Sequence, residues 1–323
     1  MNAHRRPRRR AGVAAVVPVA LLAGFAGALL GARPALAFAR YKTASGIGFF
    51  WPQTCVPVTA YPLSMTDANG QMELTSQQIM ATVTAAATTW GADSNACTYL
   101  RINVTSSTAP APEARYDYKN SIIFRTLTWG PPPDEPGSGS YDPEALAITS
   151  VFVDKSNGQI KDGDIEINNF NFSWGDLVAD PSLVGKSQDL QNALTHEMGH
   201  LIGLDHTCYV AGTKTIPIDN AGNPVPSCDM ASETVLATTM AATAIPGDTA
   251  KRTLAPDDIM GVCDIYPVAM DPMKCPAEDE PPPSTVACSA GGAGGRAGAL
   301  VAGLMTFFMT LATLARRRRA RRT

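Results

Sequence analysis

Apolar residues change their spacing along the chain, from helical to alternating and back, and each change marks an expected element. Between Thr75 and Trp90 they recur every three or four positions, which predicts a helix capped by Thr75 or Ser76. Shorter stretches that alternate, or that are rich in β-branched and aromatic residues, predict strands. These strands are expected at 41–58, 99–104, 121–127, 145–154 and 162–168.

The last two of these strands flank a Lys-Ser-Asn-Gly-Gln turn, which predicts a hairpin. A second helix should follow, with Ser187 as its N-cap and Asp189 in its electropositive first turn. Its apolar stripe consists of Leu190, Leu194, Met198, Leu201 and Ile202. The order strand, helix, strands, helix predicts an α+β fold with two long helices, a C-terminal helix and one twisted mixed sheet, mostly antiparallel at its edges.

The second helix carries the residues that point to chemistry. His196 and His200 stand four positions apart, so both rings leave one face of the helix and can converge on one ion. Gly203 can adopt the left-handed conformation that ends a helix and turns the chain back, which brings in His206 as a third ligand. Glu197 lies beside that face, where a general base could reach a water activated by the metal. Three protein ligands leave one coordination position open, as in catalytic zinc sites.

Histidine usage supports a single zinc ion. The chain has four histidines, of which one, His4, lies in the N-terminal leader and the other three are the proposed ligands. A second zinc site built from histidines is therefore excluded. Asp205, next to His206, is a rival ligand. Calcium could also bind near the predicted hairpin, where Asp154, Asp162 and Asp164 gather, although no calcium-loop template fits them and a solvated hairpin is the simpler interpretation.

The full pattern His-Glu-x-x-His-x-x-Gly-x-x-His resembles the long zinc signature of the metzincin metalloproteases. Downstream, Thr238-Thr-Met-Ala241 and Leu254-Ala-Pro-Asp-Asp-Ile-Met-Gly-Val-Cys-Asp-Ile-Tyr266 are similar to the methionine turn and the final helix of the matrixin group. The resemblance implies a metzincin-type catalytic domain, one catalytic zinc and Glu197 as general base. It also implies that Met240 lies beneath the zinc, with Met230 as the weaker candidate.

The chain departs from the matrixin pattern in three places. Thirty-four residues separate His206 from Met240, so the loop that would line the specificity pocket is rebuilt. No Pro-Arg-Cys-Gly motif precedes the domain, so latency through a cysteine is not expected. Ala242 stands where some metzincins have a zinc-binding tyrosine. Substrate preference is therefore not inherited from the resemblance.

Both ends of the chain carry targeting features. Residues 1–37 have an arginine-rich start, an apolar run and an Ala-Leu-Ala cleavage site, which predicts a signal peptide in preference to a retained membrane helix. The catalytic domain is expected at 38–275 and a Pro-rich acidic linker at 276–288. Residues 289–323 combine glycines, an apolar segment at 297–315 that is long enough to cross a bilayer, and an arginine cluster. This tail, with Cys288 before it, resembles myxobacterial surface-sorting signals; a plain membrane anchor is the alternative.

The net charge and the predicted export limit the classes of molecule that the protein could bind. Between the two terminal segments, 13 basic residues face 29 acidic ones, a net charge of −16, which disfavours nucleic-acid binding. The exported protein is expected to act as a monomer on a protein or peptide, at the cell surface or after release, and to contact the membrane only through its tail. An extended substrate is expected to pair with an edge strand near Ile165.

Six cysteines lie in the exported domain, and export favours disulfides. Six cysteines allow fifteen pairings, among which sequence cannot choose. Pairing in sequence order is favoured because each bridge then closes a local segment. The expected pairs are Cys55–Cys97, Cys208–Cys228 and Cys263–Cys275.

These features together predict an exported zinc endopeptidase. The alternative of another class is a surface-displayed binding or adhesion module that keeps zinc for stability and does no proteolysis. Glu197 argues against that alternative, because a structural zinc site needs no base. Hydrolysis of a non-peptide amide or ester by the same residues also stays open.

Overall fold

A computed structural model describes residues 38–63, 65–66, 72–130, 141–276 and 305–311. Helix α1 spans Ser76–Trp90, as the apolar spacing predicts. Thr75 caps it, and the cap is reciprocal, because Thr75 Oγ1 accepts from Gln78 N–H while Gln78 Oε1 accepts from Thr75 N–H. One side of α1 is buried, at Ile79, Val83, Ala86, Ala87 and Trp90.

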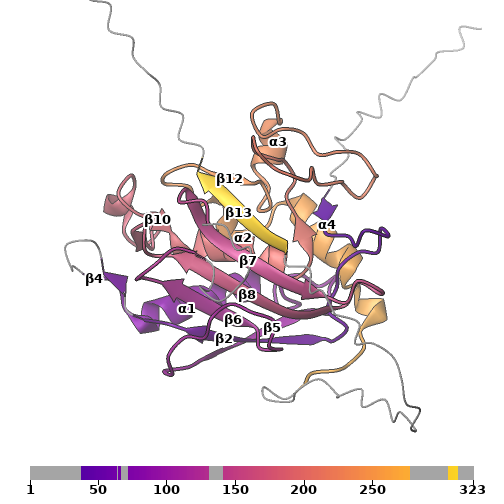
Figure 1. Cartoon of the computed structure of the whole chain (residues 1–323), viewed down its shortest axis with the longest axis horizontal. Helices are drawn as coiled ribbons and strands as arrows, with labels where there is room; N and C mark the ends of the chain where they lie inside the picture. The colour runs from indigo at the N-terminus through magenta and orange to yellow at the C-terminus, as the bar shows by residue number, and fades with distance from the viewer. Residues whose placement is uncertain (1–37, 64, 67–71, 131–140, 277–304, 312–323) are drawn as a thin grey trace, which may run out of the picture. The chain divides into compact units, whose positions relative to one another are not determined.

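A seven-stranded mixed sheet forms the centre of the described structure (Figure 1), in agreement with the predicted α+β class. Its strands, in spatial order, are β12 (Thr243–Ala244), β13 (Met305–Leu311), β7 (Ala145–Val153), β8 (Ile160–Asn168), β6 (Ser121–Arg125), β2 (Cys55–Tyr61) and β5 (Arg101–Ser106). Antiparallel pairing occurs on both sides of β7, and every other pair is parallel. The expected antiparallel edges are therefore wrong, since both outermost pairs are parallel.

The hairpin of β7 and β8 is confirmed, with Asp154 and Gly158 in its turn. Its position in the sheet is not the predicted one. Ile165 was expected on an edge strand, but β8 lies between β6 and β7. The prediction failed because residue pattern identifies a strand but not its neighbours. Neither strand of the hairpin is at an edge of the sheet, because β7 pairs with β13 on its other side, and the edge strands are β12 and β5.

Helix α2 spans Leu190–Leu201 and packs against both α1 and β7. Its N-cap is Asp189, whose carboxylate accepts from Asn192 N–H, so the prediction of Ser187 as N-cap is wrong by two residues. The helix is buried along nearly its whole length, because α1 and the sheet enclose it. Trp90 joins the two helices by donating its indole N–H to Thr195 O at 2.7 Å.

Short elements complete the described fold. A two-residue pair forms between β1 and β11, so the segment just after the predicted signal peptide lies against the chain that follows α2. Helix α4 contains the Asp-Asp-Ile motif noted above. The remaining bounds are β1 Ala39–Arg40, β3 Met65–Thr66, β4 Met72–Leu74, β9 Trp174–Gly175, β10 Gln188–Asp189, β11 Leu204–Asp205, α3 Glu233–Leu236 and α4 Pro256–Ile265, with 3₁₀ turns at Pro181–Leu183, Ala250–Arg252 and Val268–Met270.

The disulfides correct two of the three predicted pairings. Only Cys208–Cys228 forms as predicted. The other bridges are Cys55–Cys275 and Cys97–Cys263, which span 220 and 166 residues of sequence. Proximity in sequence misled the prediction, because the C-terminal part of the domain returns to the start of β2 and to the end of α1.

The predicted targeting segments lie largely outside the described residues, including 1–37, the linker from 277 on and Cys288. Among the residues that the structure describes, no helix is long and apolar enough to cross a membrane. Part of the expected membrane-spanning segment is described, and it is not helical. Met305–Leu311 forms strand β13, whose backbone hydrogen bonds are made with β7 and β12 rather than within a helix.

We expect replacement of Cys55 and Cys275 together by Ser to lower the free energy of unfolding by about 2–5 kcal/mol, because their bridge closes a very long loop. The Cys208–Cys228 bridge closes a loop of only 20 residues, so replacing these two cysteines should lower the free energy of unfolding by less. Urea unfolding of both variants measures the difference. Non-reducing peptide maps that link Cys55 to Cys97 would contradict the pairing.

Candidate metal centre

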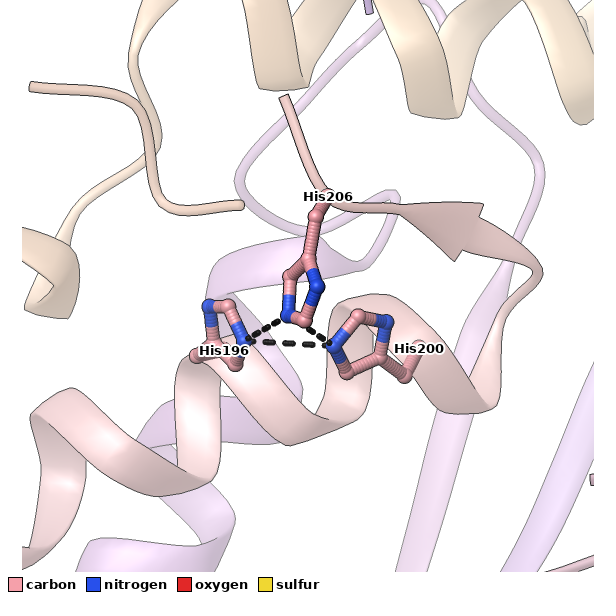
Figure 2. Close-up of side chains that lie close together, drawn as sticks. All are labelled: His196, His200 and His206. Carbon is pink, nitrogen blue, oxygen red and sulfur yellow. Dashed lines mark hydrogen bonds between the residues drawn. The ribbon is translucent and has the colours of Figure 1, made fainter. Parts of the chain in front are cut away.

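Three imidazole rings meet at one point in the structure (Figure 2). His196 and His200 come from α2, and His206 comes from the chain just after β11. The Nε2 atom of His200 lies 3.2 Å from that of His196 and 3.0 Å from that of His206, and the third distance is 3.2 Å. Gly203 makes this possible, since its φ of 98° ends α2 and reverses the chain.

In two of the rings, the hydrogen bond at Nδ1 determines whether Nε2 carries a proton. His196 Nδ1 lies 2.6 Å from Thr239 O, and His200 Nδ1 lies 3.0 Å from Leu204 O. A carbonyl oxygen can only accept, so each Nδ1 must carry the proton and donate it. In a neutral ring, Nε2 is then a bare lone pair. Lone pairs at about 3 Å repel one another unless a cation lies between them, so the three histidines are positioned to bind a metal ion.

Burial keeps these rings neutral. All three are at most 8% exposed. Burial lowers the pKa of His200 to about 4 and lowers the pKa of His196 and His206 well below the usual value, and the positive charge of Lys251 adds to the effect. A metal ion binds the neutral form of imidazole, so the site is in its binding form at neutral pH.

Tyr41 links His200 to Asp205. The Tyr41 hydroxyl lies 2.8 Å from His200 Nδ1 and also hydrogen-bonds the Asp205 carboxyl group. Burial raises the pKa of Asp205 to about 7, and one of its oxygens accepts from His206 N–H at 2.7 Å. Asp205, the rival ligand of the sequence analysis, is therefore not part of the described metal-binding group and supports the histidines from behind.

Glu197 is fully buried next to the metal centre, and its two oxygens differ. Oε2 accepts from the Thr149 hydroxyl at 2.6 Å, whereas Oε1 has no hydrogen-bond partner among the described residues. Burial raises the pKa of Glu197 to about 7, against the opposing effects of Thr149 and Lys251. A buried carboxylate oxygen without a donor is costly in free energy, and such an atom indicates a missing ligand or water.

A side chain of helix α4 holds the segment at Thr239 and Met240 through hydrogen bonds. Asp258 accepts from Thr239 N–H at 2.8 Å and from Met240 N–H at 3.3 Å, and the Thr239 carbonyl in turn accepts the hydrogen bond from His196 Nδ1–H. Met240 is buried, and a side chain at Gly199 would collide with its sulfur, which therefore packs directly under α2. Met230, the weaker candidate for this position, is 83% exposed.

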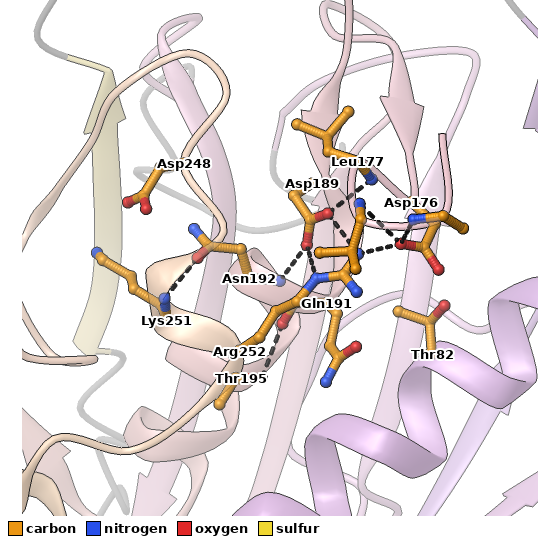
Figure 3. Close-up of polar contacts among 12 residues, drawn as sticks. Thr82, Asp176, Leu177, Asp189, Gln191, Asn192, Thr195, Asp248, Lys251 and Arg252 are labelled. Atoms are coloured by element: carbon orange, nitrogen blue, oxygen red, sulfur yellow. Dashed lines mark hydrogen bonds and ion pairs between the residues drawn. The ribbon is translucent and has the colours of Figure 1, made fainter. Parts of the chain in front are cut away.

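Two cations hold the other side of α2 (Figure 3). Arg252 binds the carboxylates of Asp189 and Asp176, so it fixes the N-terminus of α2. Lys251 is 2% exposed, its N–H binds Asn192 Oδ1, and its ammonium group donates to Ala241 O at 2.5 Å. Burial lowers the pKa of Lys251 to about 8, although Asp248, Asp258 and Glu197 act against this.

Two of the three acidic residues named for the hairpin accept hydrogen bonds from backbone N–H groups of a neighbouring loop. Asp162 accepts from the N–H groups of Asp117 and Tyr118, and Asp164 accepts from those of Arg115 and Ser121. Their oxygens therefore hold the 114–121 loop. Across the described ranges, the three histidines are the one group of potential ligands close enough to share an ion.

Sequence reasoning missed Thr149, Tyr41 and Lys251. Thr149 stands in a strand that was correctly predicted, and it is a polar residue in a mostly apolar run, which is the signal that could have marked it. Tyr41 and Lys251 have no such signal, since only the three-dimensional fold brings them to α2. Asp258 lay in the motif that carried the resemblance, but its contacts with Thr239 and Met240 were not foreseen.

We expect Tyr41→Phe to weaken metal affinity by roughly 10–100-fold, because the hydroxyl fixes the orientation of His200. Tyr61→Phe, far along β2, is the matched control and should bind as the parent does. Competition titration with a chromogenic chelator measures both. Equal affinities for the two variants would show that Tyr41 does not support the centre.

Comparisons with known proteins add no further assignment. No protein-family model matches the chain, and a search of curated proteins finds no match. What is established is a mixed α/β fold in which His196, His200 and His206 are positioned to bind a metal ion beside the buried carboxylate of Glu197.

Proposed function

We propose that the protein is an exported zinc-dependent endopeptidase of the metzincin type. The observation that carries the proposal is the convergence of three histidine Nε2 atoms beside a buried carboxylate oxygen that has no donor among the described residues. A metal that served only stability would need the first feature and not the second.

Zinc fits the donor set. Three imidazoles are typical zinc ligands, and tetrahedral bonds of ~2.0–2.1 Å would place neighbouring ligand nitrogens about 3.3 Å apart. The nitrogens lie 3.0–3.2 Å apart, which needs little adjustment. When bound, zinc would polarise the scissile carbonyl and make an attacking water more acidic.

Glu197 supplies the proton transfers. Its Oε1 accepts a proton from the attacking water while the water oxygen forms a bond to the carbonyl carbon. As the carbon–nitrogen bond breaks, the same carboxyl group delivers that proton to the leaving amine. Thr149 holds Oε2, so Oε1 keeps its direction through both steps. A pKa near 7 suits a group that accepts and then donates a proton at neutral pH.

The alternative is a surface-displayed module that binds zinc for stability. Burial of Glu197 Oε1 without a hydrogen-bond donor destabilises the folded state. A module that binds zinc only for stability gives no reason to keep such a carboxylate. Export is proposed from the signal-like N-terminus and the three disulfides, and surface display from the arginine-ended tail.

We expect Glu197→Gln to keep one zinc per chain and to lower the rate of cleavage of an unfolded protein by ~100–10,000-fold, since the amide cannot accept the proton. Glu144→Gln, an exposed change of the same type, is the control and should cleave as the parent does. Metal analysis and a fluorescent casein assay, with and without chelator, measure both properties.

Two results would count against the proposal. If Glu197→Gln cleaves as fast as Glu144→Gln, the assigned general base is wrong. If the zinc-loaded parent cleaves no protein or peptide at all, the binding-module alternative replaces the endopeptidase.

A further inference from the structure

Strand β13 lies in a slot between two other strands. It runs antiparallel to β7 and parallel to β12, so it is hydrogen-bonded on both sides. Figure 1 shows it as the yellow strand alongside β7. The other edge of β7 is taken by β8. Without β13, the slot would present one free edge of β7 and one of β12 to any extended chain.

The slot runs along the strand that contacts Glu197. Phe307 of β13 is paired with Thr149, the residue that holds Glu197 through a 2.6 Å hydrogen bond. On the other side, Thr243 and Ala244 of β12 follow Met240 by three and four residues. An extended backbone in this slot is therefore placed between the strand that orients the base and the segment that supports His196.

An endopeptidase must hold its substrate in an extended conformation, because a peptide bond inside folded structure is not accessible to the catalytic groups. Strand addition at an exposed sheet edge provides this through backbone hydrogen bonds, with little dependence on side chains. The slot between β7 and β12 offers two such edges. We infer that Met305–Leu311 occupies the position of the substrate and that the C-terminal tail is an internal inhibitor of the enzyme.

The inference deepens the proposed function and rests on it. The sequence Met-Thr-Phe-Phe-Met-Thr-Leu carries no charge, so nothing in it opposes entry into a buried slot. Thirty residues separate Cys275 from Met305, and a tether of this length keeps the occupant at an effective concentration on the order of millimolar. A free substrate has to compete with it.

The arrangement has a release step. The same residues belong to the apolar segment 297–315, and a membrane-spanning helix satisfies its backbone groups internally. A chain cannot span the bilayer and fill the slot together. Cleavage anywhere between Cys275 and Met305, such as near Cys288, also separates the occupant from the domain. Either event would open the site.

The test uses the full chain, purified away from membranes. Thr306 and Phe307 are both replaced by Pro, because consecutive N–H groups of a strand point to opposite sides and one of the two must face β7. The control places the same two prolines at Ala299 and Leu300, before the strand. Hydrogen exchange of residues 145–151 is measured in the Glu197→Gln background, so that cleavage does not interfere.

The expected result is exchange in β7 that is roughly tenfold or more faster in the Thr306→Pro, Phe307→Pro chain than in the control. With Glu197 restored, the KM for an unfolded protein should fall by about tenfold while kcat is unchanged, since an internal competitor has been removed. A chain that ends at Gly303 should behave in the same way. A chain that ends at Ala315 keeps the strand and should remain inhibited.

Equal exchange of residues 145–151 in the two proline variants would overturn the inference, whatever the activity. Equal KM values would also overturn it. Failure of the proposed function is distinguishable, because then no zinc-loaded chain would cleave anything, while the exchange experiment would still report whether the tail occupies β7.

Discussion

The metal centre depends on where two imidazole protons are held. The carbonyl oxygens of Thr239 and Leu204 accept hydrogen bonds from the protonated Nδ1 atoms of His196 and His200, so that the Nε2 lone pairs of these rings face inward. The Thr239 carbonyl belongs to a segment far from α2 in sequence, whereas the Leu204 carbonyl follows directly after the helix. One lies before Met240 and is fastened by Asp258, and the other lies at the turn made by Gly203. The fold thus selects the tautomer before any ion binds.

The surroundings of the centre are buried but contain a charged group. A buried ammonium group, Lys251, lies close enough to lower the pKa of all three histidines and of Glu197. Its charge favours neutral imidazole and ionised carboxylate, which are the forms that metal binding and base catalysis need. Burial acts with the lysine at the histidines and against it at Glu197. The pKa of Glu197 is therefore set by burial, which raises it, and by the Thr149 hydrogen bond and the charge of Lys251, which lower it.

Much of this arrangement could be predicted from the sequence, and the failures have a common cause. Local features were foreseen correctly: the capped helix from Ser76, the hairpin of β7 and β8, and the convergence of His196, His200 and His206. Each depends on spacing within one segment. The disulfides of Cys55 and Cys97, the inner position of β8 and the contact of Thr149 with Glu197 were missed, because each depends on which segments become neighbours.

The bridge between Cys55 and Cys275 has a consequence for the order of assembly. A chain that crosses a membrane from its N-terminus exposes Cys55 first, and the partner thiol follows 220 residues later. Cys97 likewise waits for Cys263. In the export that we propose, neither bond could close until almost the whole domain had been translocated, together with α2 and the Met240 segment. Under the proposed export, oxidative closure of these two bridges would therefore follow delivery of nearly the whole domain.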